Sequence, residues 1–307
     1  TLIEEKKLDG FNSDQLIYNK KATVNSIYIQ NQLKIIKNLS VQAGFRIEYF
    51  LIKKRYLKSP RFSFIYNLNS NLSYEASFGK FHQLIHHLPK VNSNKENDFY
   101  WIFSSNKIPE ISSFNFHHDI NFNKKDYTFR AGIYKKSLEK VFKFYDSPSQ
   151  YLLESSLLDS SIVNEGIGSS KGFEILIRKR EGKVTGWSSY HINRTDFNFS
   201  NLNQGLSFLG DLDKTHEVKA VLITKLKSFN LTANWVFSSG RVFTDLKNMS
   251  IVSGFKIIIN QNENKERLPF VHHLDISISK QYDLKSIKAQ IGFSIYNIYN
   301  KNNIRPI

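Results

Sequence analysis

The sequence predicts an all-β protein of antiparallel strands, arranged as a segment of a transmembrane β-barrel. The first observation is strict alternation of apolar and polar residues, as in Leu39–Leu51, where Leu, Val, Ala, Phe, Ile and Tyr share one face. The second is the length of these runs, because strands of soluble proteins are commonly about 5–6 residues long and tilted membrane-spanning strands need about 9–11. The third is that short turns join strands within a pair, whereas long segments join the pairs. Together they favour a barrel wall over a soluble sandwich.

Composition agrees with this fold class. The 307 residues suffice for one large all-β domain or two ordinary ones, and the 25 Phe and 15 Tyr suit sheets with one apolar and one wet face. Mean hydropathy is −0.39, and no window approaches the roughly 20 apolar residues of a membrane-spanning helix. A barrel points half of its side chains into a polar lumen, so an average of this kind is compatible with a membrane protein.

Charge and cysteine content limit the chemistry. The absence of cysteine excludes disulfides, thiolate nucleophiles and Cys-ligated zinc. The net charge of +16 suits an anionic partner, such as a lipopolysaccharide headgroup or an acidic ligand, although the Lys residues are scattered as AT-rich coding would scatter them. No nucleic-acid partner is predicted. Because Thr1 is not an initiator and no signal peptide precedes it, we expect a piece of a longer protein.

Six hairpins, or about twelve strands, follow an aperiodic segment 1–21 that we expect to be a loop. The hairpins begin near residues 22, 61, 112, 171, 215 and 270. Their predicted turns are Lys37-Asn38, Asn69-Ser70, Asn123–Asp126, Arg180–Lys183, Lys227-Ser228 and Tyr282–Ser286.

Each hairpin is justified by alternation on both of its strands. The first pairs a run from Ala22 with Leu39–Leu51, and the second pairs Arg61–Leu68 with Leu72–Gln83. The later ones pair the runs 114–122 with 127–133, 171–178 with 184–193, 218–226 with 229–238, and 274–278 with 287–295. Strands and loops thus fill residues 22–300, and residues 301–307 are expected to begin a last extracellular loop.

The connections between hairpins are long, at about 84–111, 139–170, 196–213 and 239–269. Outer-membrane barrels have short periplasmic turns and long extracellular loops, whereas soluble sandwiches do not separate the two kinds so regularly.

Several segments in this order resemble the C-terminal barrel of TonB-dependent outer-membrane receptors, particularly of the Bacteroidetes type. They are Ala43–Glu48 (a GxRxE strand), Pro60-Arg61 with Tyr66, Ala76–Gln83, Ser169–Glu174, Val184–Tyr190, Asp213–His216, Trp235 with Ser239-Gly240, Leu268-Pro269, His273–Asp275 and Ser294–Asn300. The resemblance spans residues 22–303.

The resemblance implies a barrel of about 22 strands around an N-terminal plug. Our first strand would be the tenth and our last the twenty-first, so the plug and one closing strand would lie outside this chain. It further implies active import across the outer membrane of a Gram-negative bacterium, without catalysis and without a cofactor. The nutrient would be an iron-siderophore, haem, cobalamin or a glycan.

The implied partners are outer-membrane lipid and lipopolysaccharide, TonB acting through the missing plug, a surface lipoprotein, and a small-molecule or oligosaccharide ligand.

Candidate ligand contacts lie in the long loops and on the polar face. His86 and His87, with Tyr100 and Trp101, are placed in the loop 84–111, where they could stack on or contact an iron chelate or haem. Arg46 and Arg130 are expected in the lumen, in ion pairs or on a substrate track. The same two interpretations, ion pairs or a substrate track, apply to the further lumen residues Glu48, Glu75, Glu174 and Arg178.

No metal site is predicted from the paired histidines. The pairs are His86-His87, His117-His118 and His272-His273. Adjacent residues of a strand face opposite sides, so such a pair rarely supplies two ligands to one ion. The Gly-rich segment 164–172 lacks P-loop spacing and enters a strand, and Asp211, Asp213 and His216 fit turn chemistry better than catalysis.

Two alternatives stay open at this point. One is a free-standing outer-membrane enzyme or adhesin of about twelve strands, which requires a closing pair between 22–36 and 286–300. The other is a soluble β protein that binds an anionic polymer, which requires a buried apolar face.

Overall fold

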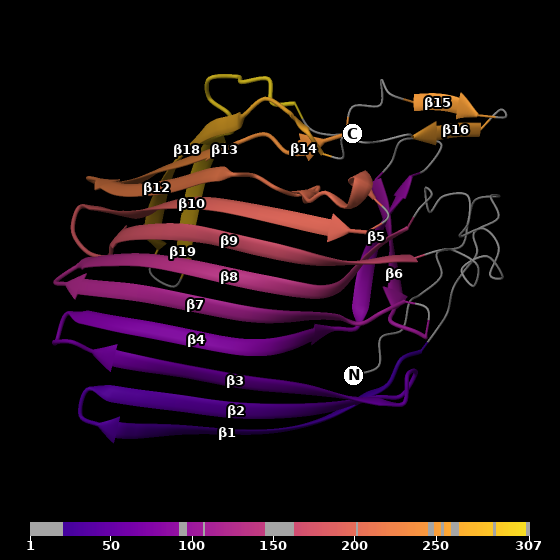
Figure 1. Cartoon of the computed structure of the whole chain (residues 1–307). Helices are drawn as coiled ribbons and strands as arrows, with labels where there is room; N and C mark the ends of the chain where they lie inside the picture. Colours follow the sequence, from indigo (N-terminus) through magenta and orange to yellow (C-terminus); the bar gives the residue numbers. More distant parts are fainter. Residues whose placement is uncertain are drawn as a thin grey trace.

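One antiparallel sheet contains the twelve predicted strands, and each strand lies beside the next of the twelve in the chain (Figure 1). The computed structural model describes residues 21–91, 97–106, 108–144, 163–200, 202–244, 249–252, 255–258, 264–284 and 287–304. The strands are β1 (Val24–Ile36), β2 (Leu39–Phe50), β3 (Arg55–Asn67), β4 (Leu72–Gln83), β7 (Ile111–Lys124), β8 (Tyr127–Phe144), β9 (Val163–Lys179), β10 (Val184–Phe199), β12 (His216–Leu226), β13 (Phe229–Ser238), β18 (Val271–Leu284) and β19 (Ile287–Ile295). The two-residue strand β11 (Phe208–Leu209) is a thirteenth member and pairs with β10.

The six predicted hairpins are confirmed. The turns at Lys37-Asn38 and Lys227-Ser228 join β1 to β2 and β12 to β13. In the turn after β9, Gly182 has a φ of +105°, a conformation that residues with a Cβ rarely adopt. Nearly all of the loop expected at 1–21 lies outside the described residues, and residues 301–304 contain no strand.

Strand β9 begins at Val163, eight residues before the predicted start near 171. Its first half is rich in Gly and Ser, so the sequence indicated a loop. In the structure Gly166 and Gly168 face the aromatic rings of Phe199 and Phe197, and a Cβ at either glycine would lie 2.5 to 2.7 Å from a ring carbon. The glycines therefore make room for bulky neighbours on β10, which strand propensity does not reveal.

The segment 84–111, expected to be a polar loop, contains a hairpin of β5 (Ile85–Val91) and β6 (Asn97–Phe103). Figure 1 shows this hairpin standing across the end of the sheet where the long connections lie. Two shorter pairs, β14 (Val242–Phe243) with β17 (Glu266–Arg267) and β15 (Met249–Val252) with β16 (Phe255–Ile258), occur between β13 and β18. The short turns lie at the opposite end of the sheet (Figure 1). We call the two ends the long-loop end and the short-turn end.

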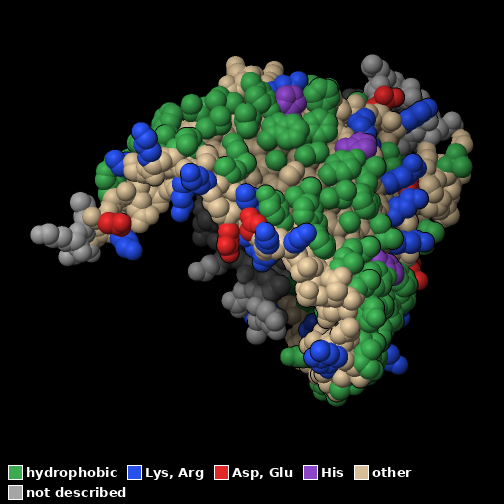
Figure 2. All heavy atoms as spheres, turned by 90° about the vertical axis from the view of Figure 1, so that its left-hand side faces the viewer, with side chains coloured by type: hydrophobic (Ala, Val, Ile, Leu, Met, Phe, Trp, Pro, Cys, Tyr) green, Lys and Arg blue, Asp and Glu red, His purple; other side chains and the backbone are tan. Residues whose placement is uncertain are grey.

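The two faces of the curved sheet differ in polarity. Seen from the short-turn end, hydrophobic side chains cover most of the outer, convex side (Figure 2). Exposed large side chains on this side include Ile29 (74% exposed), Ile120 (53%) and Ile133 (55%). An exposed apolar face of this size suits lipid and contradicts the alternative of a soluble protein, which requires that face to be buried.

The sheet is open. Among the described residues, β1 pairs only with β2 and β19 pairs only with β18. The closing pair that a free-standing barrel of about twelve strands requires is therefore not formed, and that alternative was wrong in this respect.

Buried apolar side chains are few, since both faces of a barrel wall contact something other than a protein core. One cluster, formed by Val141, Phe199 and Phe208, lies at the long-loop end. In the described part of the chain, no helix is long and apolar enough to cross a membrane.

Candidate functional site

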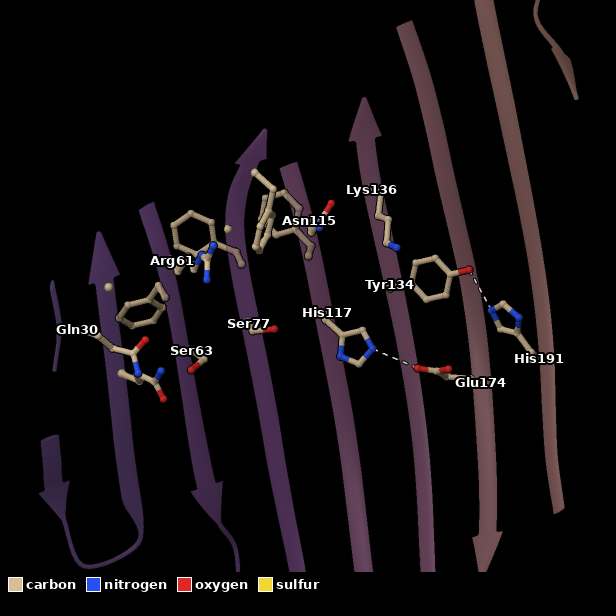
Figure 3. A pocket seen from close by; sticks show the side chains of 17 residues that line it. Gln30, Arg61, Ser63, Ser77, Asn115, His117, Tyr134, Lys136, Glu174 and His191 are labelled. Carbon is tan, nitrogen blue, oxygen red and sulfur yellow. Dashed lines mark hydrogen bonds and ion pairs between the residues drawn. The ribbon is translucent and has the colours of Figure 1, made fainter. Parts of the chain in front are cut away.

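The polar face carries a cavity of about 610 Å³ near the middle of β2, β3, β4, β7 and β8. The antiparallel register brings polar residues of successive strands into rows, because Ser63 pairs with Ser77, Ser77 with His117, and His117 with Tyr134. Figure 3 shows these side chains pointing from the strands to the same side. The polar lining residues are Gln30, Gln42, Arg61, Ser63, Ser77, Asn115, His117, Tyr134, Lys136, Glu174 and His191.

Two positively charged side chains, Arg61 and Lys136, line this cavity together with the carboxylate of Glu174. The Arg61 guanidinium lies 4.8 Å from the centre of the Phe81 ring, and Lys136 Nζ lies 5.8 Å from the centre of the Tyr134 ring. Such cation–π contacts hold the charged groups beside the cavity without neutralising them.

A buried carboxylate stands at one side of the cavity. Asp119 is 1% exposed, and Arg130 donates two hydrogen bonds to it, Nε to Oδ1 at 2.9 Å and Nη2 to Oδ2 at 2.8 Å. His117 Nδ1 lies 2.6 Å from Asp119 Oδ2, and its Nε2 lies 3.2 Å from Glu174 Oε1.

This cluster depends on Gly132 of β8. Gly132 pairs with Asp119 on one side and with Glu174 on the other, so it stands directly between them. A Cβ at this position would lie 2.3 Å from Asp119 Oδ1. The missing side chain thus provides the space in which carboxylates from β7 and β9 approach the same histidine. A second pair borders this space, with Tyr134 Oη 3.0 Å from His191 Nε2 (Figure 3).

At the long-loop end, Glu110 is 3% exposed and forms ion pairs with three positively charged side chains. Lys53 Nζ lies 2.6 Å from Oε2, and Arg55 Nη1 and Lys140 Nζ lie 2.5 and 3.6 Å from Oε1. Although burial raises the pKa of a carboxyl group, the hydrogen bond from Lys53 and the charges of Lys53 and Lys140 lower the pKa of Glu110 to about 2. Glu110 therefore ties the β2–β3 connection to the start of β7 and to β8.

His86, one of the predicted ligand contacts, is buried. It is 3% exposed, its Nε2 lies 2.8 Å from Ser104 Oγ, and its ring meets Phe142 edge-on. Burial lowers the pKa of His86 to about 4, which the hydrogen bond to the Pro109 backbone only partly offsets. His86 thus packs against Ser104 and Phe142 near the start of the β5–β6 hairpin.

The other three predicted loop contacts lie on the same hairpin. In the backbone register His87 pairs with Trp101, and Tyr100 is the next residue of β6. Trp101 is 57% exposed, while the side chains of His87 and Tyr100 lie outside the described residues.

The predicted lumen arginines lie on the polar face of the sheet. Arg46 Nε is 3.3 Å from Glu48 Oε1, and Arg46 Nη2 donates to Ser26 Oγ at 3.2 Å. Arg130 holds Asp119 as described. Neither arginine lines the cavity directly, and both lie in the main sheet, whereas β5 and β6 form a separate two-stranded sheet.

Sequence reasoning did not identify Arg61, Asp119 and Lys136. Asp119 carried a signal, since it follows His117 by two residues and must share its face of the strand. Arg61 and Lys136 are brought together only by the pairing of four successive strands, which alternation within one strand does not specify.

The arrangement offers binding chemistry of positive charge, aromatic rings and neutral hydrogen-bonding groups.

Among known proteins, the family described as TonB dependent receptor-like, beta-barrel matches residues 5–298. No curated protein is similar enough in sequence to match the chain.

Solved structures share the fold over 92% of this chain. The FrpB iron transporter from Neisseria meningitidis is 13% identical, with a TM-score of 0.64 over 42% of its own chain. The siderophore receptor PirA from Acinetobacter baumannii is 10% identical, with a TM-score of 0.64 over 42% of its chain. A mutant of the ferric enterobactin receptor PfeA from Pseudomonas aeruginosa is 9% identical, with a TM-score of 0.62 over 40% of its chain. The chain spans less than half the length of each.

The family match covers nearly the whole chain, and the long apolar-faced strands agree with it independently. The expectations of a non-enzymatic class and of an outer-membrane location are therefore confirmed at the level of the family. The chain belongs to the TonB-dependent receptor-like β-barrel family, whose members are transporters of the Gram-negative outer membrane rather than enzymes.

Proposed function

We propose that this chain forms part of the barrel wall of an outer-membrane receptor that imports a ferric chelate by TonB-dependent active transport. The observation that carries the proposal is the family match over residues 5–298, on a sheet whose polar face holds a cavity of about 610 Å³. The structural neighbours named above are an iron transporter, a siderophore receptor and a ferric enterobactin receptor, which favours a ferric chelate over haem, cobalamin or a glycan.

The lining chemistry supports an anionic chelate. Ferric complexes of carboxylate and catecholate ligands carry net negative charge, and Arg61 and Lys136 place two positive charges beside the cavity. Asn115 and Gln42 add neutral donors and acceptors. Arg46 and Arg130 lie in pairs on the same polar face, where they would extend a polar track for the ligand.

The β5–β6 hairpin supplies the proposed first contact on the outer side. Trp101 is exposed, and His87 and Tyr100 are its neighbours across and along the strands. An exposed tryptophan such as Trp101 can stack on the planar ligands of a chelate. His86 would support the hairpin from within, because it is buried against Ser104 and Phe142.

The partners follow from the two faces. Outer-membrane lipid and lipopolysaccharide would contact the apolar convex face and its basic surroundings. TonB would act through the plug domain of the receptor, and a surface lipoprotein would approach the long-loop end.

The test is uptake in cells that lack other receptors of this kind. Cells that express the receptor containing this segment, with and without TonB, are given radioactive iron as ferric citrate, a ferric catecholate and a ferric hydroxamate. Labelled haem, cobalamin and an oligosaccharide serve as competing ligand classes. We expect one ferric chelate to accumulate only in cells that contain TonB.

Matched variants connect the result to the cavity. Arg61→Gln is expected to raise the KM for uptake several-fold, whereas Arg178→Gln, also on the polar face but away from the cavity lining, leaves the KM unchanged. Equal uptake with and without TonB, or uptake of a ligand without iron, would contradict the proposal.

A further inference from the structure

The imidazole of His117 lies between two carboxylates. Its Nδ1 is 2.6 Å from Asp119 Oδ2 and its Nε2 is 3.2 Å from Glu174 Oε1. The three side chains come from β7 and β9, and their ligand atoms all lie within 4.8 Å of one another. Figure 3 shows the Glu174 side of this arrangement, with His117 and Glu174 pointing toward each other.

The two nitrogen–oxygen contacts of His117 need two hydrogen-bond donors, and a neutral imidazole has one. A neutral imidazole carries one N–H, and ionised carboxylates only accept hydrogen bonds. With one N–H, one of the two nitrogen–oxygen contacts would place a lone pair against a lone pair. One of the two nitrogen–oxygen contacts therefore requires a positive charge in addition to the single N–H. This charge is either a second proton on the imidazole or a metal ion.

The two positions differ in access. Asp119 is 1% exposed and Arg130 bonds to both of its carboxylate oxygens, so the Nδ1 contact is closed to solvent and suits an N–H donor. The side chains of His117 and Glu174 are 29% and 43% exposed, and both line the cavity. An ion arriving from the cavity would reach Nε2 and the Glu174 carboxylate first.

We propose that His117 Nε2 and the Glu174 carboxylate bind a divalent transition-metal ion, with Asp119 orienting the imidazole through the Nδ1–H. Metal-binding histidines commonly donate their other N–H to a carboxylate, which fixes the ring and strengthens it as a ligand. Arg130 fixes Asp119 in turn through two hydrogen bonds.

The distances fit such an ion. Zinc bonds to nitrogen and oxygen are about 2.0–2.2 Å long, so donors 3.2 Å apart would subtend an angle of about 100° at the metal. That angle lies between the octahedral and tetrahedral values. An imidazole and a carboxylate suit Zn²⁺, Co²⁺ or Ni²⁺, whereas Mg²⁺ and Ca²⁺ favour oxygen alone.

Two protein donors leave several coordination positions directed into the cavity, so the site would hold its ion weakly and exchange it. Gly132 makes the geometry possible, because it leaves open the position on β8 between Asp119 and Glu174. The proposal departs from the sequence-based expectation of no metal site, which considered adjacent histidine pairs such as His117-His118 and not residues on neighbouring strands. His118 indeed points away, with its Nδ1 2.6 Å from Tyr74 Oη.

The test is direct metal binding to the purified protein in detergent, after removal of bound metal with a chelator. Isothermal titration with Zn²⁺ and the visible absorption of bound Co²⁺ measure stoichiometry and ligand field. We expect one ion per chain, at least tenfold weaker binding in Glu174→Gln and in His117→Gln, and roughly 10–100-fold weaker binding in Asp119→Asn. Glu48→Gln, which removes another carboxylate from the polar face, should bind as the unaltered protein does.

Glu174→Gln keeps the shape of a partly exposed side chain, and its unfolding midpoint, measured alongside, separates lost binding from lost structure. The absence of a bound ion in the unaltered protein would overturn the proposal, and the contact between His117 and Glu174 would then be made by a second proton on the imidazole. Binding that persists at full strength in both His117→Gln and Glu174→Gln would also overturn it. The readout is independent of transport, so a failed uptake experiment leaves this proposal unaffected.

Discussion

Arg130 and Asp119 form a two-bond pair across β7 and β8, with Nε to Oδ1 at 2.9 Å and Nη2 to Oδ2 at 2.8 Å. The carboxylate is almost fully buried, whereas the arginine side chain is 43% exposed to the polar face. The pair therefore fixes a buried negative charge at the edge of the cavity, and it couples two strands of the wall through side chains as well as through their backbone.

Arg130→Gln is expected to destabilise the protein by about 3 kcal/mol, because it leaves a buried carboxylate without its main partner. Arg130→Lys should restore only part of this loss, since an ammonium group cannot donate the two parallel hydrogen bonds. Urea unfolding from lipid vesicles measures both variants. Asp119→Asn combined with Arg130→Gln should be more stable than Arg130→Gln alone, and strictly additive effects would contradict the pairing.

Gly132→Ala is expected to destabilise the protein by about 1–3 kcal/mol, because the new Cβ would lie 2.3 Å from Asp119 Oδ1 and must displace it. Gly44→Ala is the matched control on the same face. There the nearest atoms, of Gln30 and Ile29, lie at 3.6 Å, an ordinary contact, so we expect a change of about 0.5 kcal/mol or less. Equal effects of the two substitutions would show that Gly132 does not hold open the space between the carboxylates.

Glu110 is expected to make stability depend on acid pH. Its pKa is lowered from 4.5 to about 2 by its cationic partners, so its contribution is fully present above about pH 4.5 and is lost as the pH falls toward 2. Glu110→Gln should lower the unfolding midpoint at pH 7, and the difference from the unaltered protein should shrink as the pH falls below 4.5. The exposed Glu181 in a short turn provides the control, for which Glu181→Gln should change little at any pH. A difference that grows on acidification would have the wrong sign for this account.

Ile133→Arg is expected to destabilise the barrel by about 2–4 kcal/mol if the residue lies near the bilayer midplane, because it places a charge on the lipid face. Ile133 is 55% exposed on the convex side, and its neighbour Tyr134 lines the cavity. Unfolding from lipid vesicles measures the loss. Arg178→Gln, on the polar face, is the comparison and should cost less.

Much of the fold could be predicted from alternation alone. The period-two pattern in Leu39–Leu51 assigned the correct face to every residue from Val41 to Glu48, because each side chain of a strand must alternate. The turns were predictable for a related reason, since short polar segments interrupt the pattern.

Other features depend on contacts between strands, and the sequence does not specify those. The first half of β9 resembled a loop, because its glycines are explained only by the rings of Phe197 and Phe199 on β10. The β5–β6 hairpin was missed because its strands are short and do not alternate regularly. The cluster of His117 with Glu174 requires the register of three strands, with Gly132 in the middle, which no single-strand pattern supplies.

β7 and its neighbours are expected to present one face to lipid and the other to a wet lumen. The chain contains no cysteine, so single cysteines can be introduced one at a time along β7. Ile120→Cys and Phe122→Cys lie on the apolar face, outside the cavity lining, and Asn115→Cys and Asn121→Cys lie on the polar face. Each variant is treated, in intact outer membranes, with a water-soluble maleimide, and is then labelled with a fluorophore and exposed to a quencher dissolved in the lipid.

We expect strict alternation along β7. Cysteines at 115 and 121 should react with the water-soluble reagent and escape the lipid-phase quencher, whereas those at 120 and 122 should do the reverse. Reaction of all four positions with the water-soluble reagent, without quenching from the lipid, would contradict the assignment of the apolar face to the membrane.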